Sequence, residues 1–540
     1  MTEKAFQEYD PAYFNYCYGC GPLNEHGLHI QSYWDVDETV CRFQAKPYHT
    51  AFPGYVYGGL IASLIDCHSM STAVAAAYRA DGREMGTPPP FAFCDGFLAG
   101  GFFAPDPARG LSSGCPTGMA YAAYAGFCHE PALKIWAGKS LGTVYENSRR
   151  EVAEKPSVVI GYAMTEKQGG SDLRETQTTA VFSHAADYHG ATAHWYELTG
   201  HKWFCSVPQS DGFFTLAKVN GGVTCFFLPR TLPDGSYNRF FIQRLKDKAG
   251  NRSNAGSEVE YSGTMAIRVG DEGAGIREII SHSHLTRLDF AVGSAGLMRQ
   301  VLTLALNHTT TRHGFGSSLA KRPMMANVLA DMAVEVEAAT LMALRIAKAT
   351  DYLDIHPQEK AFARVTTPLS KYFNCSRVVA VANEALQCHG GNGFVEDGPM
   401  ARLYREAPLN SVWEGTANMM CMDVRRAMLK DASCREALFA EFEDVRGLDA
   451  RFDGYLNAMG PLLDEMLKDE FLARPASEAM ARSLQGAELL RYSIPAVIDV
   501  FMKTRLGGLS NAWGVMFGTL GPSINQAQAN HIVERAQIQR

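Results

Sequence analysis

The sequence has no long apolar segment and little excess of charge of one sign. No run of about 20 apolar residues is present, so we expect no membrane-spanning helix. The formal net charge of −7 gives no overall attraction to nucleic acid. The first ten residues are acidic and polar, unlike a secretory signal or an organelle transit peptide, so we expect a cytoplasmic protein.

The cysteines give little support for disulfide bonds or metal binding. There are thirteen, an odd number, in apolar contexts that suit reduced core thiols better than a disulfide framework. Cys17 and Cys20 form a single Cys-x-x-Cys without a second pair or a histidine pair downstream. This is a weak metal signal, and we predict no metal site.

The chain, at 540 residues, is too long for one hydrophobic core. Residues 1–108 alternate short β-type runs with turns, contain one apolar helical run, and end in a tract rich in proline, glycine and phenylalanine. Residues 109–159 have a helical pattern, and residues 160–272 have the alternation of β-strands. Strands are predicted at 195–198, 212–218, 222–228 and 257–261. Residues 273–435 and 436–540 have the periodicity of helices, and the pattern becomes helical beyond Gly275. The clearest apolar repeats predict helices at 285–312, 323–353, 361–389 and 417–429. We predict a multidomain α+β fold with these five segments.

A glycine-bearing turn lies at the start of the β segment, in residues 164–172 (MTEKQGGSD). Gly169 and Gly170 let backbone amides approach a ligand closely, and Thr165 and Ser171 offer hydroxyls to a cofactor. A plain polar turn is the alternative interpretation.

Three further motifs suit a dinucleotide cofactor. Trp203, in GHKWFCS, follows a strand turn, where its indole can stack on a flavin or fill the core. Arg312 and Phe315, in RHGFG, end a long helical run, where a guanidinium suits a pyrophosphate or merely complements the helix dipole. Residues 387–394 (QCHGGNGF) break two helices, and either cap a helix or let backbone meet a cofactor.

Glu414 is the candidate catalytic base. It precedes Gly415 and Thr416, which can cap a helix that begins near Ala417, so its carboxylate should stand on a loop at a helix start. The helix dipole favours an acidic side chain there, so a structural role is the alternative.

The order and spacing of these motifs resemble the acyl-CoA dehydrogenase family from about residue 114 onward. The resemblance implies partial N-terminal helices, a middle β-barrel, a C-terminal four-helix bundle and an additional C-terminal helical segment. The sequence is most similar to the AidB-like, adaptive-response branch of that family. Residues 164–172, 200–211 (GHKWFCSVPQSD) and 244–255 (RLKDKAGNRSNA) match that branch almost letter for letter.

The resemblance implies that FAD is the cofactor. The flavin ring would contact Met164, Thr165, Gly170, Ser171, Trp203, Phe204 and Ser206. The ADP part would be held across a subunit interface by Arg312, Phe315, Gln387, Gly390 and Gly391. This implies a homo-oligomer, either a dimer or a tetramer. Thr416 and Asn418 would also contact the cofactor, and Trp413 and Arg426 would narrow the acyl pocket.

The implied reaction is the α,β-dehydrogenation of an acyl-CoA thioester. Glu414 would remove the α-proton while the flavin accepts hydride from the β-carbon, and an electron-transfer flavoprotein would take the electrons. The alternative within this branch is a flavoprotein with a DNA-binding or alkylation-protection role and little turnover. The charges of residues 451–540 are nearly balanced, although Lys503, Arg505 and Arg535 could form a basic face.

Residues 1–108 resemble a truncated PaaI-like hotdog thioesterase, on the strength of CYGCG, HGL and the run that contains Gly58, Gly59 and Asp66. The resemblance implies that the two glycines open a central helix whose amides polarise a thioester carbonyl, with Asp66 as catalytic acid. Tyr57 stands where that family usually has histidine, and only part of the fold is covered. Thioesterase activity is a minor alternative function.

Overall fold

The structure is a computed structural model that describes residues 4–9, 23, 25, 28–35, 38–44, 50–52, 55–56, 79, 115–142, 144, 146, 148–507 and 525–537. The chain divides into two compact units, Met1–Phe93 and Cys94–Arg540.

The described residues of the first unit form short elements. They are the 3-10 helix η1 (Phe6–Tyr9), the antiparallel pair β1 (Ser32–Asp35) and β2 (Glu38–Cys41), and the antiparallel pair β3 (Thr50–Phe52) and β4 (Tyr55–Val56).

The candidate thioesterase residues Gly58, Gly59 and Asp66 lie outside the described residues, as do Cys17 and Cys20. The hotdog resemblance and the thioesterase alternative therefore stay predictions.

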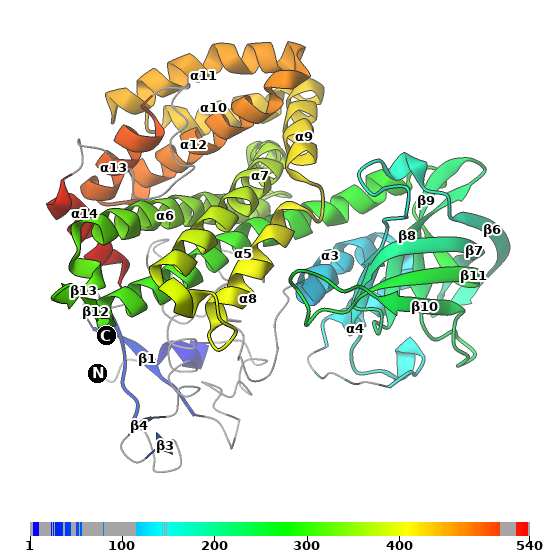
Figure 1. Ribbon diagram of the computed structural model, residues 1–540. Coiled ribbons are helices and arrows are strands. Elements are labelled where there is room, and N and C mark those ends of the chain that lie inside the picture. The colour runs from blue at the N-terminus through cyan, green and yellow to red at the C-terminus, as the bar shows by residue number, and fades with distance from the viewer. Residues whose placement is uncertain are drawn as a thin grey trace. The chain divides into compact units, whose positions relative to one another are not determined.

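A seven-stranded sheet forms the β part of the second unit (Figure 1). Its strands are β5 (Ile160–Ala163), β6 (Thr179–Tyr188), β7 (Ala191–Ser206), β8 (Gly212–Val219), β9 (Gly222–Pro229), β10 (Phe240–Leu245) and β11 (Gly256–Val269). The strand order is β10-β11-β9-β8-β5-β7-β6, and β11 also pairs with β7. This pairing closes five strands into a ring, so the prediction of a middle β-barrel is confirmed.

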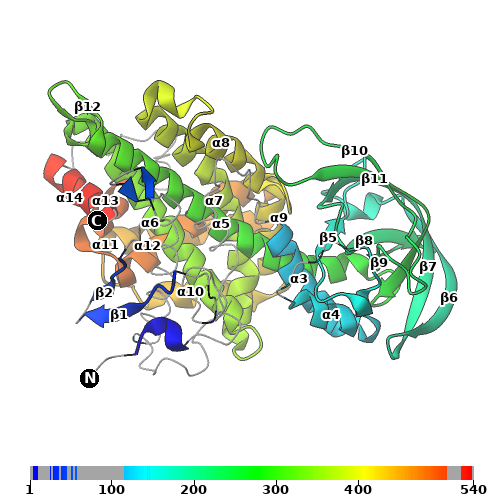
Figure 2. The ribbon, with the colours of Figure 1, turned by 90° about the horizontal axis from the view of Figure 1, so that it is seen from below.

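Two short helices, α3 (Cys115–His129) and α4 (Lys134–Ser140), lie beside this sheet (Figure 2). Phe127 of α3 and Trp136 of α4 pack on Phe227 of β9, with ring centroids 5.1 and 4.6 Å away. Trp136 Nε1 donates to the Tyr188 hydroxyl at 3.0 Å. Burial of these large rings fixes the helices on the sheet, since each buries far more apolar area than an aliphatic side chain.

Long helices follow the sheet. They are α5 (Gly275–Thr311), α6 (Pro323–Asp351), α7 (Pro357–Cys388), the short α8 (Pro399–Glu406) and α9 (Ala417–Lys430). Helices α6, α7 and α8 each begin with proline, whose fixed φ and missing N–H suit a first helical position. Helices α5, α6, α7 and α9 pack together as the predicted four-helix bundle.

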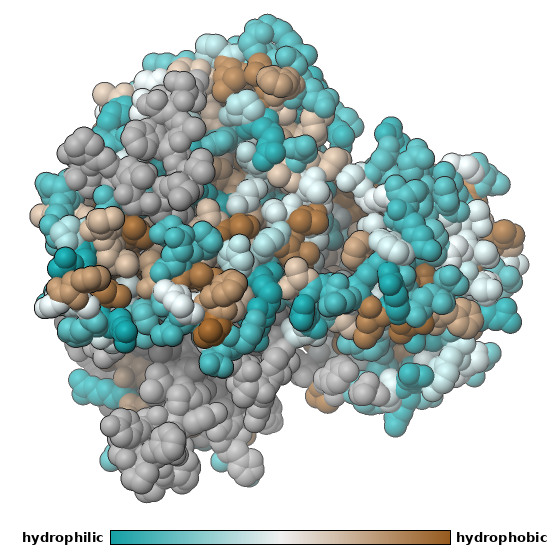
Figure 3. Space-filling view, viewed as in Figure 1, coloured by the Kyte–Doolittle hydropathy of each residue, from teal (hydrophilic) through white to brown (hydrophobic). Residues whose placement is uncertain are grey.

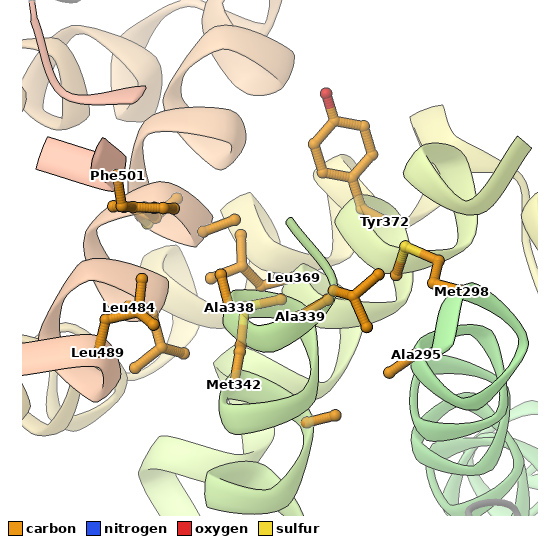
Figure 4. Close-up of a cluster of buried hydrophobic side chains, with 14 of the residues drawn as sticks. Ala295, Met298, Ala338, Ala339, Met342, Leu369, Tyr372, Leu484, Leu489 and Phe501 are labelled. Atoms are coloured by element: carbon orange, nitrogen blue, oxygen red, sulfur yellow. The ribbon is translucent and has the colours of Figure 1, made fainter. Parts of the chain in front are cut away.

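Five more helices complete the described chain: α10 (Ala432–Glu443), α11 (Ala450–Lys468), α12 (Ala473–Tyr492), α13 (Pro495–Arg505) and α14 (Gln526–Ala536). Their apolar side chains join the core of the bundle. Figure 4 shows Phe501 and Leu484 beside Ala338, Met342 and Leu369. The hydrophobic core thus crosses position 435, and the predicted domain boundaries stay predictions.

The distribution of apolar residues and cysteines agrees with the expectations from the composition. On the face shown in Figure 3, apolar residues occur in small groups between hydrophilic ones. None of the helices built from described residues is long and apolar enough to cross a membrane. Among the cysteines within the described ranges, Cys205, Cys225 and Cys375 are buried free thiols, as expected.

Candidate active site

Glu414 lies in the turn that joins the 3-10 helix η9 (Ala407–Ser411) to α9, and its side chain is half-buried. Its φ is 56°, in the left-handed region, and Gly415 follows with φ 101°. A non-glycine residue in this region costs about 1–2 kcal/mol of conformational energy. The backbone around Glu414 therefore needs other contacts to hold it.

Two cations from neighbouring helices hold this turn. The Nζ of Lys371, on α7, donates to the carbonyl oxygens of Trp413 at 2.7 Å and Gly415 at 2.5 Å. The Nε of Arg287, on α5, donates to the carbonyl oxygen of Glu414 at 3.0 Å. All three carbonyls from 413 to 415 are thus bound by fixed donors. Burial lowers the pKa of Lys371.

Behind the turn, Asp423 joins two arginines. Its carboxylate accepts from Arg287 Nη1 at 2.8 Å and from Arg364 Nη2 at 2.7 Å. Burial opposes ionisation of Asp423, but the arginines hold its pKa below the usual value. His284 lies nearby, and burial together with the two arginines lowers its pKa to about 4. At neutral pH His284 is therefore a neutral imidazole beside the two guanidinium groups.

Trp413 forms one wall beside the candidate base. Its ring stacks on Phe290 of α5, with centroids 4.4 Å apart, and it packs against a small cluster of Met119 from α3 and Val207 after β7. The indole Nε1 is buried and has no hydrogen-bond partner in the described part of the chain. The helical bundle, α3 and the β-sheet thus meet at this residue.

Tyr162 on β5 belongs to the same cluster. Its hydroxyl lies 3.1 Å from Nδ1 of His282, whose Nε2 lies 3.6 Å from a carboxylate oxygen of Glu278. Burial, then Cys225 and Glu414, raise the pKa of Tyr162 well above its ordinary value. The phenol is therefore a neutral hydrogen-bonding group near the candidate base.

The predicted flavin-ring residues come together on two adjoining strands. The turn after β5 carries Met164, Thr165, Gly170 and Ser171, and the end of β7 carries Trp203, Phe204 and Ser206. The amide of Trp203 donates to the carbonyl of Thr165 at 2.7 Å, which joins the two groups. Phe204 is 49% exposed, so an aromatic face is available for stacking.

Lysines surround the indole of Trp203. The Nζ of Lys246 lies 3.2 Å from the ring centroid, and the Nζ of Lys167 lies 5.4 Å from it. A side-chain carbon added at Gly170 would lie 2.5 Å from Oγ1 of Thr165. The turn therefore requires glycine at this position to keep the threonine hydroxyl in place.

The predicted ADP-binding residues gather at one end of the bundle. His308 of α5 and His389 after α7 stack with ring centroids 4.7 Å apart, so the end of α5, which leads to Arg312 and Phe315, lies beside the end of α7, which carries Gln387 and leads to Gly390 and Gly391. Phe315 is 86% exposed. A side-chain carbon at either glycine would meet no atom within 4 Å. Exposed guanidinium, aromatic and bare backbone groups fit the phosphates and adenine of FAD.

The remaining predicted residues lie on α9. Asn418 Oδ1 accepts from Arg474 at 3.3 Å, and Arg426 is exposed. Thr416 takes the N-cap position of a helix that begins at Ala417, as expected, although its side chain makes no cap hydrogen bond. The backbone carbonyl of Thr416 instead accepts from Met420, so the first turn forms without the hydroxyl.

The basic residues named for a phosphate-binding face have acidic partners. Lys503 pairs with Asp499 at 2.7 Å, Arg505 is buried against Asp331 and Glu335, and Arg535 pairs with Glu337. These contacts neutralise the three cations.

Comparison with known proteins defines the class. The family model "Acyl-CoA dehydrogenase, middle domain" matches residues 161–264, and "Acyl-CoA dehydrogenase, C-terminal domain" matches residues 273–429. The Escherichia coli (strain K12) protein AidB, which is named as an acyl-CoA dehydrogenase, is 38% identical over 73% of this chain and 71% of its own length. Acyl-CoA dehydrogenase family member 11 of Caenorhabditis elegans is 28% identical over 70% of this chain and 62% of its own.

Two solved structures share the fold. Caenorhabditis elegans ACDH-11 in complex with C11-CoA has a TM-score of 0.63 and 24% identity, covering 82% of this chain and 72% of that one. An acyl-CoA dehydrogenase from Bacillus anthracis complexed with FAD has a TM-score of 0.57 and 16% identity, covering 75% and 82%.

The chain belongs to the acyl-CoA dehydrogenase family. Its similarity to AidB confirms the predicted AidB-like branch, and the family confirms the predicted class, an FAD-dependent oxidoreductase. The individual site residues stay predictions. Lys371, Arg287 and Tyr162 were missed, because nothing in the local sequence shows which helical or strand residue faces the turn at Glu414.

Proposed function

We propose that this protein oxidises the Cα–Cβ bond of an acyl-CoA thioester, with Glu414 as the base that removes the α-proton. The observation that carries the proposal is the fixed backbone of residues 413–415, where Lys371 and Arg287 bind three successive carbonyls. A base on a clamped turn keeps its carboxylate at a constant distance from a bound substrate, as proton abstraction requires.

The surrounding side chains suit an acyl chain. Trp413, Met119 and Val207 give an apolar wall beside the carboxylate, and this wall would exclude water from the α-carbon. The backbone amide of Glu414 would donate to the thioester carbonyl oxygen, on which negative charge develops when the α-proton leaves. Arg426 is exposed, so it would have to turn inward to narrow the pocket.

The FAD would be held by the residues predicted for it. Thr165, Ser171 and Trp203 would bind the ring, and Arg312 and Gln387 would hold the phosphates of an FAD bound across a subunit interface, so the proposed enzyme is a homo-oligomer. Bound FAD supplies the acceptor for the hydride from the β-carbon. Because Phe315, Gly390 and Gly391 are open to solvent, they are available to a group that spans two copies.

The substrate and partners follow from the class. The Caenorhabditis elegans relative was solved with C11-CoA, which supports a medium-chain acyl-CoA as the first thioester to test. We propose an electron-transfer flavoprotein as the electron acceptor and the cytoplasm as the location.

The test is the anaerobic reduction of the purified flavoprotein by a panel of acyl-CoA thioesters. Glu414→Gln should keep the bound flavin but slow its reduction by about 10²–10⁴-fold, the usual contribution of a general base. Glu436→Gln, an exposed glutamate on α10, is the matched control and should reduce at the wild-type rate. Wild-type reduction in Glu414→Gln would refute the role of this carboxylate.

A further inference from the structure

A separate cavity of about 540 Å³ lies where β5 and β8 begin and β7 and β9 end. None of the predicted flavin, acyl or catalytic residues lines it. Its walls carry the charged groups Glu146, Arg149, Lys155, Asp211 and Arg230, together with polar and aromatic side chains.

Two of these charges are already neutralised. Nζ of Lys155 donates to Asp211 Oδ1 at 2.6 Å and to the carbonyl oxygens of Glu146 and Ser148 at 3.0 and 2.8 Å. The other oxygen of Asp211 accepts from the amide of Val159 at 2.9 Å. This pair fixes the floor of the cavity and has little capacity left for a ligand.

The two arginines of the cavity, unlike Lys155, are not paired with a carboxylate among the described residues. Neither Arg149 nor Arg230 forms an ion pair with a carboxylate in the described ranges. The guanidinium of Arg230 lies 4.3 Å from the ring centroid of Phe240 and donates to the carbonyl of Pro208 at 3.0 Å. The guanidinium of Arg149 lies 5.3 Å from the ring centroid of Tyr237. Each guanidinium is thus oriented by an aromatic ring and keeps donors for a ligand.

The floor holds an unsatisfied hydroxyl. Ser210 lines the cavity and is 1% exposed, and its Oγ has no partner among the atoms that the structure describes. A buried hydroxyl without a partner is unfavourable, so native proteins nearly always provide one. An oxygen of a bound ligand would provide it here. Burial and the positive charge of the neighbouring Arg149 lower the pKa of Arg230. This agrees with two guanidinium groups that line the same cavity.

We propose that this cavity binds the dianionic group of a small organic molecule, held between Arg149 and Arg230 with Ser210 as a third donor. A phosphate monoester and a dicarboxylate share this chemistry. Two guanidinium groups match a doubly charged oxygen acid, because each can donate two parallel hydrogen bonds.

The site also touches the proposed active site. Val159 and Val207 line the cavity, and both belong to the cluster that packs with Trp413. A ligand in the cavity therefore rests on the far side of residues that support the turn of Glu414. Binding in the cavity does not require the proposed reaction, so it can be tested whether or not the protein oxidises an acyl-CoA.

The experiment is isothermal titration of the full-length flavoprotein at constant ionic strength. The probes are inorganic phosphate, succinate and, for single charge, acetate. Phosphate alone, succinate alone or both should bind with one site per chain, and the pattern distinguishes the two sources of dianion. Acetate should bind at least about tenfold more weakly, because it can satisfy only one guanidinium.

The variants locate the site. Arg230→Met and Arg149→Met should each weaken binding by about tenfold or more, and Ser210→Ala by a smaller factor. Arg252→Met, an arginine that is 66% exposed, is the control and should bind like wild type. Circular dichroism checks that each variant folds. If an arginine variant does not fold, the binding affinity of Ser210→Ala tests the site in its place. Absence of phosphate and succinate binding, or equal binding by all folded variants, would overturn the proposal.

Discussion

Lys202 and Glu166 form a buried ion pair beside the predicted flavin turn. The two side chains are 0% and 1% exposed, and Lys202 Nζ lies 2.7 Å from Glu166 Oε1. The carboxylate also accepts from Thr178 Oγ1 at 2.6 Å and from the amide of Gln177 at 2.7 Å. Lys202 has one other acceptor, the carbonyl oxygen of Leu216 at 2.8 Å. Glu166 is thus better satisfied than its partner.

The pKa values of the pair reflect this difference. Burial opposes ionisation of Glu166, yet Lys202 and the hydrogen bonds lower its pKa from 4.5 to about 2. Burial lowers the pKa of Lys202 from 10.5 to about 8 despite the attraction of Glu166. Each change corresponds to about 3 kcal/mol, with opposite effects on stability at neutral pH. The intact pair should therefore contribute little net free energy.

Removing one partner of the pair should cost much more stability than the intact pair contributes. Lys202→Met leaves a buried carboxylate without its cation, and we expect a loss of about 3–5 kcal/mol in the stability of the β-sheet. The double variant with Glu166→Gln should recover most of that loss, since no buried charge remains. Native-state hydrogen exchange at the amides of Gln177 and Thr178 measures this directly. Exchange should accelerate by about 10²–10⁴-fold in Lys202→Met, because each 1.4 kcal/mol is a factor of ten.

A control and a pH series complete the test. Lys218→Met, on strand β8, should leave exchange unchanged because Lys218 forms no ion pair with Glu166. Between pH 8 and 10.5 the folded protein has released a proton from Lys202 that the unfolded chain still holds, so stability should rise with pH there. The contribution of Glu166 is constant in that range and is lost only as pH falls from 4.5 through 2. A Lys202→Met variant as stable as wild type would refute this reasoning.

Three further predictions concern the candidate site. Lys371→Met should slow flavin reduction by about tenfold or more while FAD stays bound, because the carbonyls beside Glu414 lose their donor; stopped-flow absorbance measures both. Gly170→Ala should weaken FAD binding, since its methyl group would displace Thr165; fluorescence titration with FAD measures the affinity. His284 has a pKa of about 4 when folded and 6.5 when unfolded, so stability should fall as pH drops from 6.5 to 4, and His284→Asn should remove that slope in denaturant titrations.

Each of these has a matched control. Lys360→Met changes an exposed lysine on α7 and should reduce normally. Gly138→Ala adds a methyl group with no atom within 4 Å and should bind FAD like wild type. Normal reduction in Lys371→Met, normal FAD affinity in Gly170→Ala, or an unchanged pH slope in His284→Asn would contradict the corresponding prediction.

The bounds of the regular helices followed closely from apolar periodicity. The expected helix 323–353 is α6 at Pro323–Asp351, and the expected helix 361–389 is α7 at Pro357–Cys388. The sequence becomes helical beyond Gly275, which is where α5 begins. The apolar repeat is regular only from 285, because buried polar residues such as His282 and Ser283 interrupt it in the first turns. Periodicity identifies a helix only where its buried face is apolar.

Strand lengths were harder to predict. The expected strand 257–261 is part of β11, which runs from Gly256 to Val269. Its register against β7 shifts between Ser257 and Val259 and again between Ser262 and Thr264. Each bulge changes which side chains face inward, so the alternation on which the prediction depends breaks although the strand continues.

The family and the order of sheet and bundle were readable from the sequence, and so was the prediction of which residues bind FAD, because each of those motifs is a short contiguous run of residues. The surroundings of Glu414, by contrast, depend on tertiary packing. Lys371 and Arg287 lie on two different helices, and their partners are backbone carbonyls, which leave no signature in sequence. Such contacts arise from the packing of whole helices against one another, so they become visible only when the chain is folded.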